Sequence, residues 1–194
     1  MGLEHFSLAL YDDPVLVSEL LGMVMDDNRH LLEQLVEYPF SFFHFGDDLG
    51  HKEGLLVSPE WLAEQWLPRI KTSIAPAHDK GVPVTFHSDG RIIDAIPMIL
   101  DAGFVSLNPI EPYGMDIYDL ATRYGDRLTL IGNIDVAGPL AFGTPDEVRA
   151  QVAEHVQRLA GHCRYVGATS HSVLDELPPA NFLTMVAAFQ KHRF

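Results

Sequence analysis

A histidine and an aspartate stand two residues apart at the point where a predicted strand ends. Residues 83–86 are apolar or β-branched and predict a short buried strand, and the sequence His-Ser-Asp-Gly follows it directly. In parallel α/β proteins, the carboxyl end of a strand is where side chains leave the packed layer and perform chemistry. His87 and Asp89 are therefore candidates for metal binding or proton transfer. In the alternative interpretation, Asp89 caps the next helix and His87 is a polar residue at the rim.

The other predicted strands also end in polar side chains. These residues are Asp47 and Asp48, Asn108 and Glu111, Asn133 and Asp135, and His171. Adjacent carboxylates such as Asp47 and Asp48 can raise the pKa of one of the pair and so produce a general acid. Because all five strand ends share this pattern, we expect a barrel whose strand ends converge on one pocket.

Strands and helices alternate along the chain. We expect strands over residues 40–45, 83–87, 104–107, 128–131 and 164–168. We expect helices over residues 14–36, from residue 58 with a possible kink at Pro68, and over 91–102, 116–124, 144–160 and 178–191. This alternation predicts a parallel sheet. A Gly-x-Gly-x-x-Gly sequence after the first strand and a Gly-Lys-Ser/Thr phosphate loop are both absent, which argues against nucleotide binding.

Composition limits the classes of function. The formal net charge of −14, from 27 acidic and 13 basic residues, argues against a nucleic-acid partner and against an anionic membrane surface. No apolar run is long enough to cross a bilayer. The single cysteine, Cys163, cannot form a disulfide within the chain and is interpreted as structural. We therefore expect a cytoplasmic protein.

A series of short motifs occurs in a fixed order along residues 39–192. They are Phe-Gly-Asp-Asp at 45–48, Ser-Pro-Glu at 58–60, His-Ser-Asp-Gly at 87–90, Asn-Pro-Ile-Glu-Pro at 108–112, Met-Asp at 115–116, Gly-Asn-Ile-Asp at 132–135, Gly-Thr-Pro-Asp-Glu-Val at 143–148, Ser-His at 170–171 and Pro-x-x-Asn at 178–181. This series resembles the uroporphyrinogen decarboxylase superfamily. That group includes porphyrinogen decarboxylases and cobalamin-dependent methyltransferases that act on thiols.

The resemblance implies a partial (β/α)8 barrel, with one domain over residues 1–194 and strands four to eight of the family barrel. A complete barrel takes about 250 residues. Five parallel strands leave two unpaired sheet edges, which proteins usually cover. We therefore expect a homo-oligomer, or a partner chain that covers the edges; the remaining alternatives are a fragment and a sheet that stays open.

The methyltransferase branch is the closer match in its loop pattern. Its members bind zinc through a His-x-Cys motif and a later cysteine, and the metal activates a thiol as a thiolate. Here the motif reads His87-Ser88-Asp89, and His171 stands near the later ligand position. The resemblance thus implies a metal set of His87, Asp89, His171 and Glu111 for zinc or a harder divalent ion. It also implies a corrinoid supplied by a partner protein.

The decarboxylase branch supplies a second expectation. His171 matches a family histidine near the end of the last strand, and Asp48 lies near a polar substrate contact. We expect Asp48 and His171 to be catalytic. We expect Asp47, Asn108, Asn133 and Asp135 to contact a small-molecule substrate, although Asn133 and Asp135 are the kinds of residue that also fix loops. The expected reaction is metal-assisted methyl transfer, with porphyrinogen decarboxylation and a non-catalytic subunit that completes a barrel as alternatives.

Overall fold

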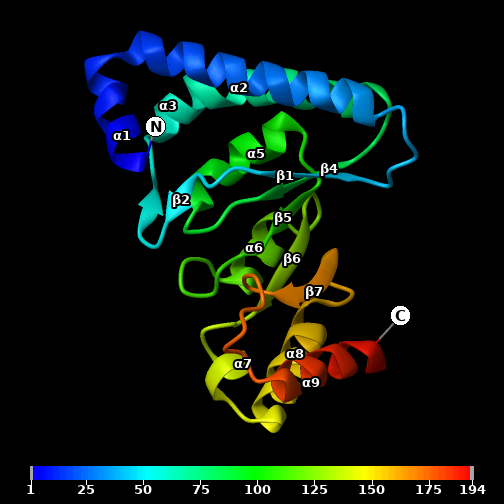
Figure 1. The fold of residues 1–194 in the computed structure, drawn as a ribbon. Helices are drawn as coiled ribbons and strands as arrows, with labels where there is room; N and C mark the ends of the chain where they lie inside the picture. The colour runs from blue at the N-terminus through cyan, green and yellow to red at the C-terminus, as the bar shows by residue number, and fades with distance from the viewer. Residues whose placement is uncertain (1, 193–194) are drawn as a thin grey trace.

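A five-stranded parallel sheet runs through the computed structural model, which describes residues 2–192 (Figure 1). Its strands are β1 (Phe43–Gly46), β4 (Val84–His87), β5 (Ser106–Asn108), β6 (Thr129–Ile134) and β7 (Tyr165–Thr169). They lie side by side in chain order, and each neighbouring pair is parallel. The expected α/β fold with five parallel strands and intervening helices is confirmed.

Most helices also lie where the apolar spacing predicts them. They are α2 (Pro14–Leu35), α4 (Leu67–Asp79), α5 (Ile96–Ala102), α6 (Ile117–Tyr124), α8 (Pro145–Leu159) and α9 (Pro179–Lys191). Four short elements were not predicted: α1 (Leu3–Asp12), α7 (Pro139–Phe142), and the antiparallel hairpin of β2 (Gly50–His51) and β3 (Gly54–Leu55). The hairpin strands are only two residues long, too short for alternation to reveal them.

The helix that starts after Ser58 changes its winding before Pro68. A short α-helical turn, α3 (Pro59–Trp61), leads into a π-helical turn at Leu62–Trp66, and α4 follows. Proline has no N–H to donate to the carbonyl four residues earlier, so the ladder must adjust near it. The expected irregularity at Pro68 therefore takes the form of a wider turn just before it.

The helix expected from residue 91 begins later, with a 3₁₀ turn at Ile93–Ala95. The cause is the turn at Gly90, whose φ of 82° lies in the left-handed region, and where a Cβ would come within 2.5 Å of the Gly50 backbone. Asp89 precedes this turn, and the 3₁₀ turn has no side-chain cap. The alternative that Asp89 is a helix cap is therefore wrong.

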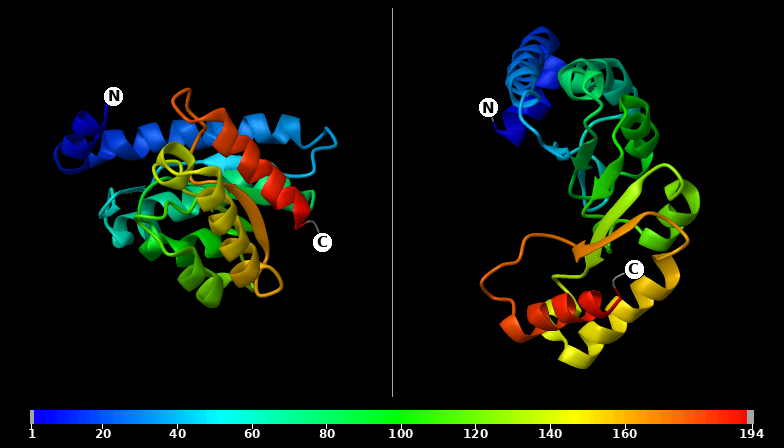
Figure 2. Two further views of the ribbon diagram at one scale, coloured as in Figure 1. Left: turned by 90° about the horizontal axis from the view of Figure 1, so that it is seen from below. Right: turned by 90° about the vertical axis from the view of Figure 1, so that its right-hand side faces the viewer.

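Two hydrophobic clusters hold the elements together. The larger cluster packs α4 and α5 against the middle strands and includes Ile70, Phe86 and Leu107. The smaller one, which includes Ile134 and Met185, packs α8 and α9 against the end of β6. Figure 1 and the right-hand view of Figure 2 show α2 and the α8–α9 pair at opposite ends of the molecule, with the sheet between them.

Both edge strands keep an exposed face. Within residues 2–192, β1 and β7 each have a neighbouring strand on one side only. His44 on β1 is exposed, and Val166 on β7 is 49% exposed, whereas Val84, Thr85 and Phe86 of β4 are buried. Unpaired edge groups of this kind are usually covered in a stable assembly.

None of the helices within residues 2–192 is both long enough and apolar enough to span a lipid bilayer.

The capping box of α8 gives a test of the local sequence signals. Thr144 Oγ1 accepts a hydrogen bond from Glu147 N at 3.3 Å, and Glu147 Oε2 accepts one from Thr144 N at 2.7 Å. We expect Thr144→Ala to lower the free energy of unfolding by about 1 kcal/mol in urea denaturation. Thr144→Ser keeps the hydroxyl and serves as the matched control. Equal losses in both variants would show that the methyl group, and not the cap, is responsible.

Candidate functional site

Parallel register brings the polar strand ends to one edge of the sheet. Gly46 at the end of β1 pairs with His87 at the end of β4, and His87 pairs with Asn108 at the end of β5. Asp48 and Asp89 lie just beyond the first two of these strands, and His171 lies just beyond β7. The sheet therefore places side chains from distant parts of the sequence beside one another, as the strand pattern predicts.

Asp48, His87 and Asp89 form a compact cluster. Each offers one ligand atom, and the three atoms lie within 4.8 Å of one another. His87 Nε2 lies 3.9 Å from Asp48 Oδ1 and 3.8 Å from Asp89 Oδ1. His171 joins from the other side, with its Nε2 at 3.3 Å from Asp89 Oδ2. Asp89 is thus the centre of a group with two imidazoles and a second carboxylate.

Asn108 sets the orientation of the His87 ring. His87 Nδ1 lies 2.8 Å from Asn108 Oδ1, and because this amide oxygen only accepts, Nδ1 carries the proton. In the neutral ring, Nε2 then holds a lone pair directed at Asp48 and Asp89. Histidines that bind metals characteristically donate their other N–H in this way, which fixes the tautomer and the ring plane.

Asp89 is the most perturbed carboxylate of the cluster. Burial raises its pKa above the usual value, and the charge of Glu111 raises it further; His87 and His171 lower it, and Asp48 raises it. Its Oδ1 is buried and has no hydrogen-bond partner among residues 2–192. An unpartnered buried carboxylate oxygen next to an imidazole lone pair is an environment that a cation would stabilise. The residues present therefore fit a divalent metal ion.

Asp47 lies on the opposite face of the sheet from Asp48. Asp47 N donates to His87 O at 3.0 Å, which continues the strand ladder, so the two neighbouring side chains alternate in direction. Asp47 Oδ2 accepts a hydrogen bond from Trp66 Nε1 at 2.7 Å. Burial raises the pKa of Asp47, while the Trp66 bond lowers it. A substrate contact by Asp47 stays a prediction, and its observed partner is a core tryptophan.

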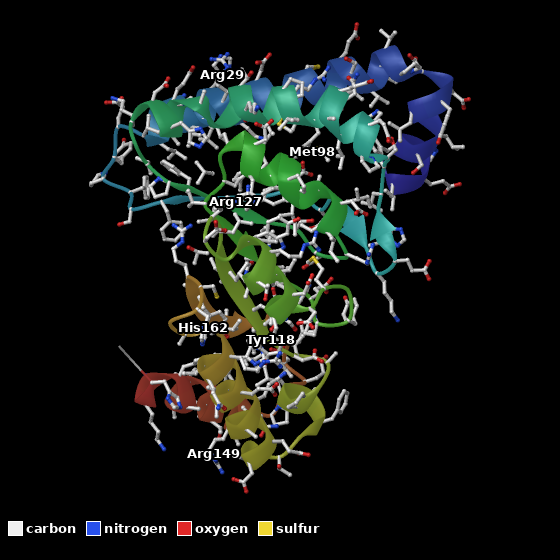
Figure 3. All side chains as sticks on the ribbon, turned by 180° about the vertical axis from the view of Figure 1, so that it is seen from behind. Arg29, Met98, Tyr118, Arg127, Arg149 and His162 are labelled. Atoms are coloured by element: carbon white, nitrogen blue, oxygen red, sulfur yellow. The ribbon has the colours of Figure 1, made fainter. Side chains whose placement is uncertain are left out.

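Asn133 is committed to a buried network. It is 3% exposed, and its Nδ2 donates to Ile110 O at 2.7 Å. Its Oδ1 lies 2.8 Å from Nε2 of His155, a histidine of α8 that is 5% exposed. His155 Nδ1 lies 3.2 Å from the hydroxyl of Tyr118, which is visible where α6 meets α8 (Figure 3). Substrate contact by Asn133 stays a prediction, and this network fixes the loop after β5.

Asp135 and Glu111 are likewise bonded to backbone amides. Asp135 Oδ1 accepts from Ala137 N at 2.9 Å and closes a turn after β6. Glu111 is 7% exposed, and its Oε2 accepts from Gly90 N at 2.5 Å while its Oε1 accepts from the Tyr113 hydroxyl. The structure thus places Glu111 beside the cluster, with both oxygens already in hydrogen bonds.

The sequence analysis did not predict three residues that lie at or near the site. His44 lies edge-on to His87 with 5.8 Å between ring centroids, and partial burial of its ring, together with the charge of His87, lowers its pKa although the residue is exposed overall. Tyr113 binds Glu111, and this bond, with burial and nearby acids, raises the Tyr113 pKa to about 12. His155 lies on a helix far along the chain. Strand register alone could have paired His44 with Thr85 and so placed it near His87.

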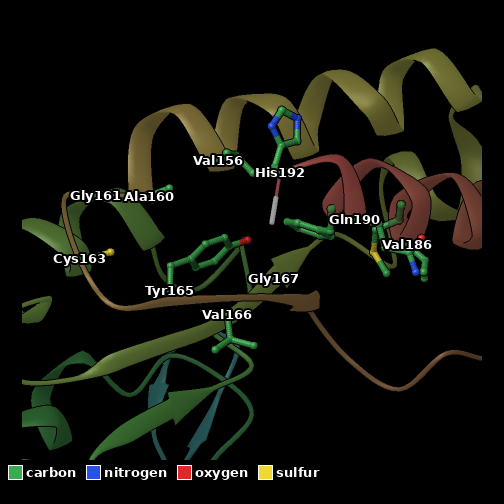
Figure 4. Close-up of a pocket in the computed structure, with 12 residues that line it drawn as sticks. Val156, Ala160, Gly161, Cys163, Tyr165, Val166, Gly167, Val186, Gln190 and His192 are labelled. Carbon is green, nitrogen blue, oxygen red and sulfur yellow. The ribbon is translucent and has the colours of Figure 1, made fainter. Parts of the chain in front are cut away.

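A second hollow lies away from the polar cluster. A groove of about 690 Å³ runs between α8, α9 and β7, and Tyr165, Val186 and Gly167 line it (Figure 4). Tyr165 points toward the helices, and Val166 points to the opposite face of the strand. Cys163 also lines this groove, where its thiol contacts Leu159 O at 3.6 Å, and burial raises its pKa. None of these residues belongs to the cluster around Asp89.

A family model described as "Uroporphyrinogen decarboxylase (URO-D)" matches residues 1–192. The chain belongs to this family. The match covers more of the chain than the motifs at 39–192, because it includes α1 and α2. The resemblance that the ordered motifs indicated is therefore confirmed.

Three known proteins are similar to this chain at 18% to 30% sequence identity. A uroporphyrinogen decarboxylase from Pelodictyon phaeoclathratiforme is 29% identical over 91% of this chain and 49% of its own length. One from Chlorobium luteolum is 30% identical over 62% of this chain and 34% of its own length. A methyltransferase from Methanosarcina mazei matches with a TM-score of 0.79 at 18% identity, over 99% of this chain and 54% of its own. The chain spans at most about half the length of the curated relatives it matches.

The burial of His155 predicts how the stability of the protein depends on pH. Burial lowers the pKa of His155, so between the lowered value and the ordinary one the unfolded state binds more protons. The stability that comes from keeping His155 neutral in the fold is complete above the ordinary histidine pKa. It is lost as the pH falls toward the lowered pKa of the folded state. We expect the wild type to lose up to about 1.4 kcal/mol per pH unit more than His155→Gln as the pH falls below about 6.5.

Chemical denaturation at a series of pH values measures this slope. His162→Gln, an exposed histidine near the end of α8, is the matched control and should keep the wild-type slope. Parallel curves for the wild type and His155→Gln would contradict the assignment.

Proposed function

We propose that this chain binds a divalent metal ion and assists methyl transfer from a corrinoid or a methylated small molecule to an acceptor. The observation that carries the proposal is the cluster of Asp48, His87 and Asp89, with His171 against the second oxygen of Asp89. Family membership supports an enzyme of this superfamily. The reaction itself is our inference from the resemblance to the methyltransferase branch, together with the donor set.

His87, Asp89, His171 and Asp48 would hold the metal. A bound divalent ion would act as a Lewis acid and favour the deprotonated form of a thiol or another acceptor. Two carboxylates and two imidazoles make a harder ligand set than thiolates, which suits zinc or a metal that prefers oxygen and nitrogen. The charge of Asp89, whose Oδ1 is buried although its side chain is 28% exposed, would offset part of the charge of the metal.

The remaining side chains would orient the ligands and move protons. Asn108 holds the His87 ring so that Nε2 faces the cluster. The Asp48 side chain is 59% exposed and the His171 side chain 43% exposed, so both are reachable from solvent. Asp48, which faces the cluster with Oδ1, would take the proton from an entering acceptor on its other oxygen. This access also suits a methyl carrier that arrives on a partner protein.

Porphyrinogen decarboxylation is the alternative reaction, supported by the names of the curated relatives. His171 and Asp48 would then be polar substrate contacts. A net charge of −14 and the carboxylates around His87 disfavour a substrate rich in carboxylates. For this reason we rank methyl transfer first. The cytoplasmic location, a single domain over 1–194 and the absence of nucleic-acid and membrane partners stay predictions from the sequence.

Metal content tests the proposed function. We expect elemental mass spectrometry to find about one equivalent of zinc or another divalent metal, either in the purified protein or after metal loading and desalting. His87→Ala and His171→Ala should lose it, because each removes an imidazole that faces Asp89. His162→Ala is the matched control and should retain it. A folded wild type that takes up no metal, or retention by His87→Ala, would rule the metal site out.

The open edges of the sheet favour a second candidate function. In this role the chain is a subunit that completes a barrel with another chain or with a second copy of itself. β1 and β7 each lack a strand on their outer side within residues 2–192, and the exposed face of Val166 adjoins that edge. Such edges tend to pair with other chains. The groove beside β7 adds further apolar surface at the same edge.

Sedimentation equilibrium tests this second candidate. We expect the wild type to sediment as an assembly larger than the monomer, and Val166→Lys to shift it toward the monomer, because a charge at the edge opposes strand pairing. Val15→Lys, at a 66% exposed position on α2, is the control. A wild type that sediments as a stable monomer would contradict this role.

A further inference from the structure

The turn between β4 and the following 3₁₀ turn is held at each of four successive backbone amides. The acceptors lie in two other segments of the chain, residues 48–51 and 108–111. The bonds are Ser88 N to Asn108 O at 3.1 Å, Asp89 N to Asp48 Oδ1 at 3.0 Å, Gly90 N to Glu111 Oε2 at 2.5 Å and Arg91 N to His51 O at 2.9 Å. Two of the four acceptors are carboxylates. The direction of the Asp89 side chain therefore depends on groups from two other stretches of the chain, residues 48–51 and 108–111.

Glu111 makes the third of these bonds from a buried position. Its second oxygen accepts from the Tyr113 hydroxyl, so the carboxylate is bonded on both sides. Hydrogen bonds from donors to an ionised carboxylate are short and strong. Because a buried carboxylate is costly unless it is bonded, these two donors hold Glu111 in one orientation. That orientation turns both of its oxygens toward protein donors.

Asp89 is in the opposite state. Its Oδ1 is buried without a hydrogen-bond partner among the described residues, and it faces His87. Gly90 comes next in the chain with a positive φ of 82°, which glycine adopts without strain, and its N–H donates to Glu111 Oε2. A bond that fixes Gly90 N thus fixes the residue before it. The free oxygen is on Asp89, and the bonded oxygens are on Glu111.

The geometry points to a positioning role for Glu111 and Tyr113, which we propose in place of metal ligation by Glu111. Together they hold the Asp89–Gly90 turn so that Asp89 Oδ1 faces His87. The part of this inference that concerns metal affinity rests on the proposed function, because it states how Asp89 is oriented as a metal ligand. Groups that orient ligands typically change metal affinity 10- to 100-fold when removed.

The first experiment needs no metal. Amide resonances of Asp89 and Gly90 are measured by NMR in the metal-free wild type and in Glu111→Gln. We expect the Gly90 proton to move upfield when the charged acceptor is lost, and the Asp89 amide to shift with it. Asp101→Asn changes the charge equally at an exposed position on α5 and should leave both resonances unchanged. Unchanged Asp89 and Gly90 resonances in folded Glu111→Gln would overturn the inference.

The second experiment measures Co²⁺ affinity and the visible spectrum of the Co²⁺-loaded protein. Glu111→Gln should weaken binding by 10- to 100-fold and keep the wild-type absorption bands, because the ligands are unchanged. Asp89→Asn should abolish binding. Bands that change in Glu111→Gln, or binding lost as completely as in Asp89→Asn, would make Glu111 a ligand and overturn the inference.

Tyr113 provides an independent arm. Tyr113→Phe removes the hydroxyl that holds Glu111 Oε1, so we expect a smaller loss of Co²⁺ affinity than in Glu111→Gln, again with unchanged bands. Tyr11→Phe, at an 88% exposed position on α1, is the matched control. Tyr113→Phe that binds as tightly as the wild type would overturn the part assigned to Tyr113.

The two experiments separate this inference from the proposed function. A wild type that binds no metal, with Asp89 and Gly90 resonances that respond to Glu111→Gln, would remove the metal site and leave the positioning role supported. A wild type that binds metal, with resonances that do not respond, would support the metal site and overturn the positioning role.

Discussion

The site depends on the parallel register that sets Gly46, His87 and Asn108 side by side. These three residues end β1, β4 and β5, and they pair directly across the ladder. Because the register is shared, the residue after each strand emerges at the same edge of the sheet. A slip of one residue would send His87 to the opposite face and separate it from both Asp48 and Asn108. The buried side chains of β4 oppose such a slip.

Electrostatics then decides what the cluster can do. Asp48, Asp89 and Glu111 bring three carboxylates near His87 and His171, and burial already raises the pKa of Asp89. Hydrogen bonds from backbone amides and from Tyr113 satisfy Glu111, and Asn108 satisfies one side of His87. Asp89 Oδ1 and His87 Nε2 then face each other, and His171 Nε2 faces the second oxygen of Asp89. The proposed cation would stabilise this arrangement.

Several residues with the right chemistry for a site have their hydrogen-bond partners outside the cluster. Asp47 and Asp48 are neighbours in sequence, yet strand alternation sends Asp47 to Trp66 and Asp48 to the cluster. Asn133 ends a strand as His87 does, but its side chain joins Ile110 to His155 inside the protein. Polar type and position at a strand end are thus necessary for the site and do not suffice, because the direction of the side chain decides.

The sequence by itself determined the alternation of strands and helices, the parallel sheet and the family, because periodicity, helix caps and ordered motifs are local signals. It also predicted that His87, Asp89 and His171 form a group, because the strand ends of such a sheet converge. Only the tertiary structure decided which acids join them. The partners of Asp48 and Glu111 lie in the turn at residues 89–90 and that of Asn133 lies on α8, and contacts between distant segments leave no periodic trace in the sequence. The hairpin at Gly50–Leu55 escaped for the same reason, because its form depends on packing against the Gly90 turn.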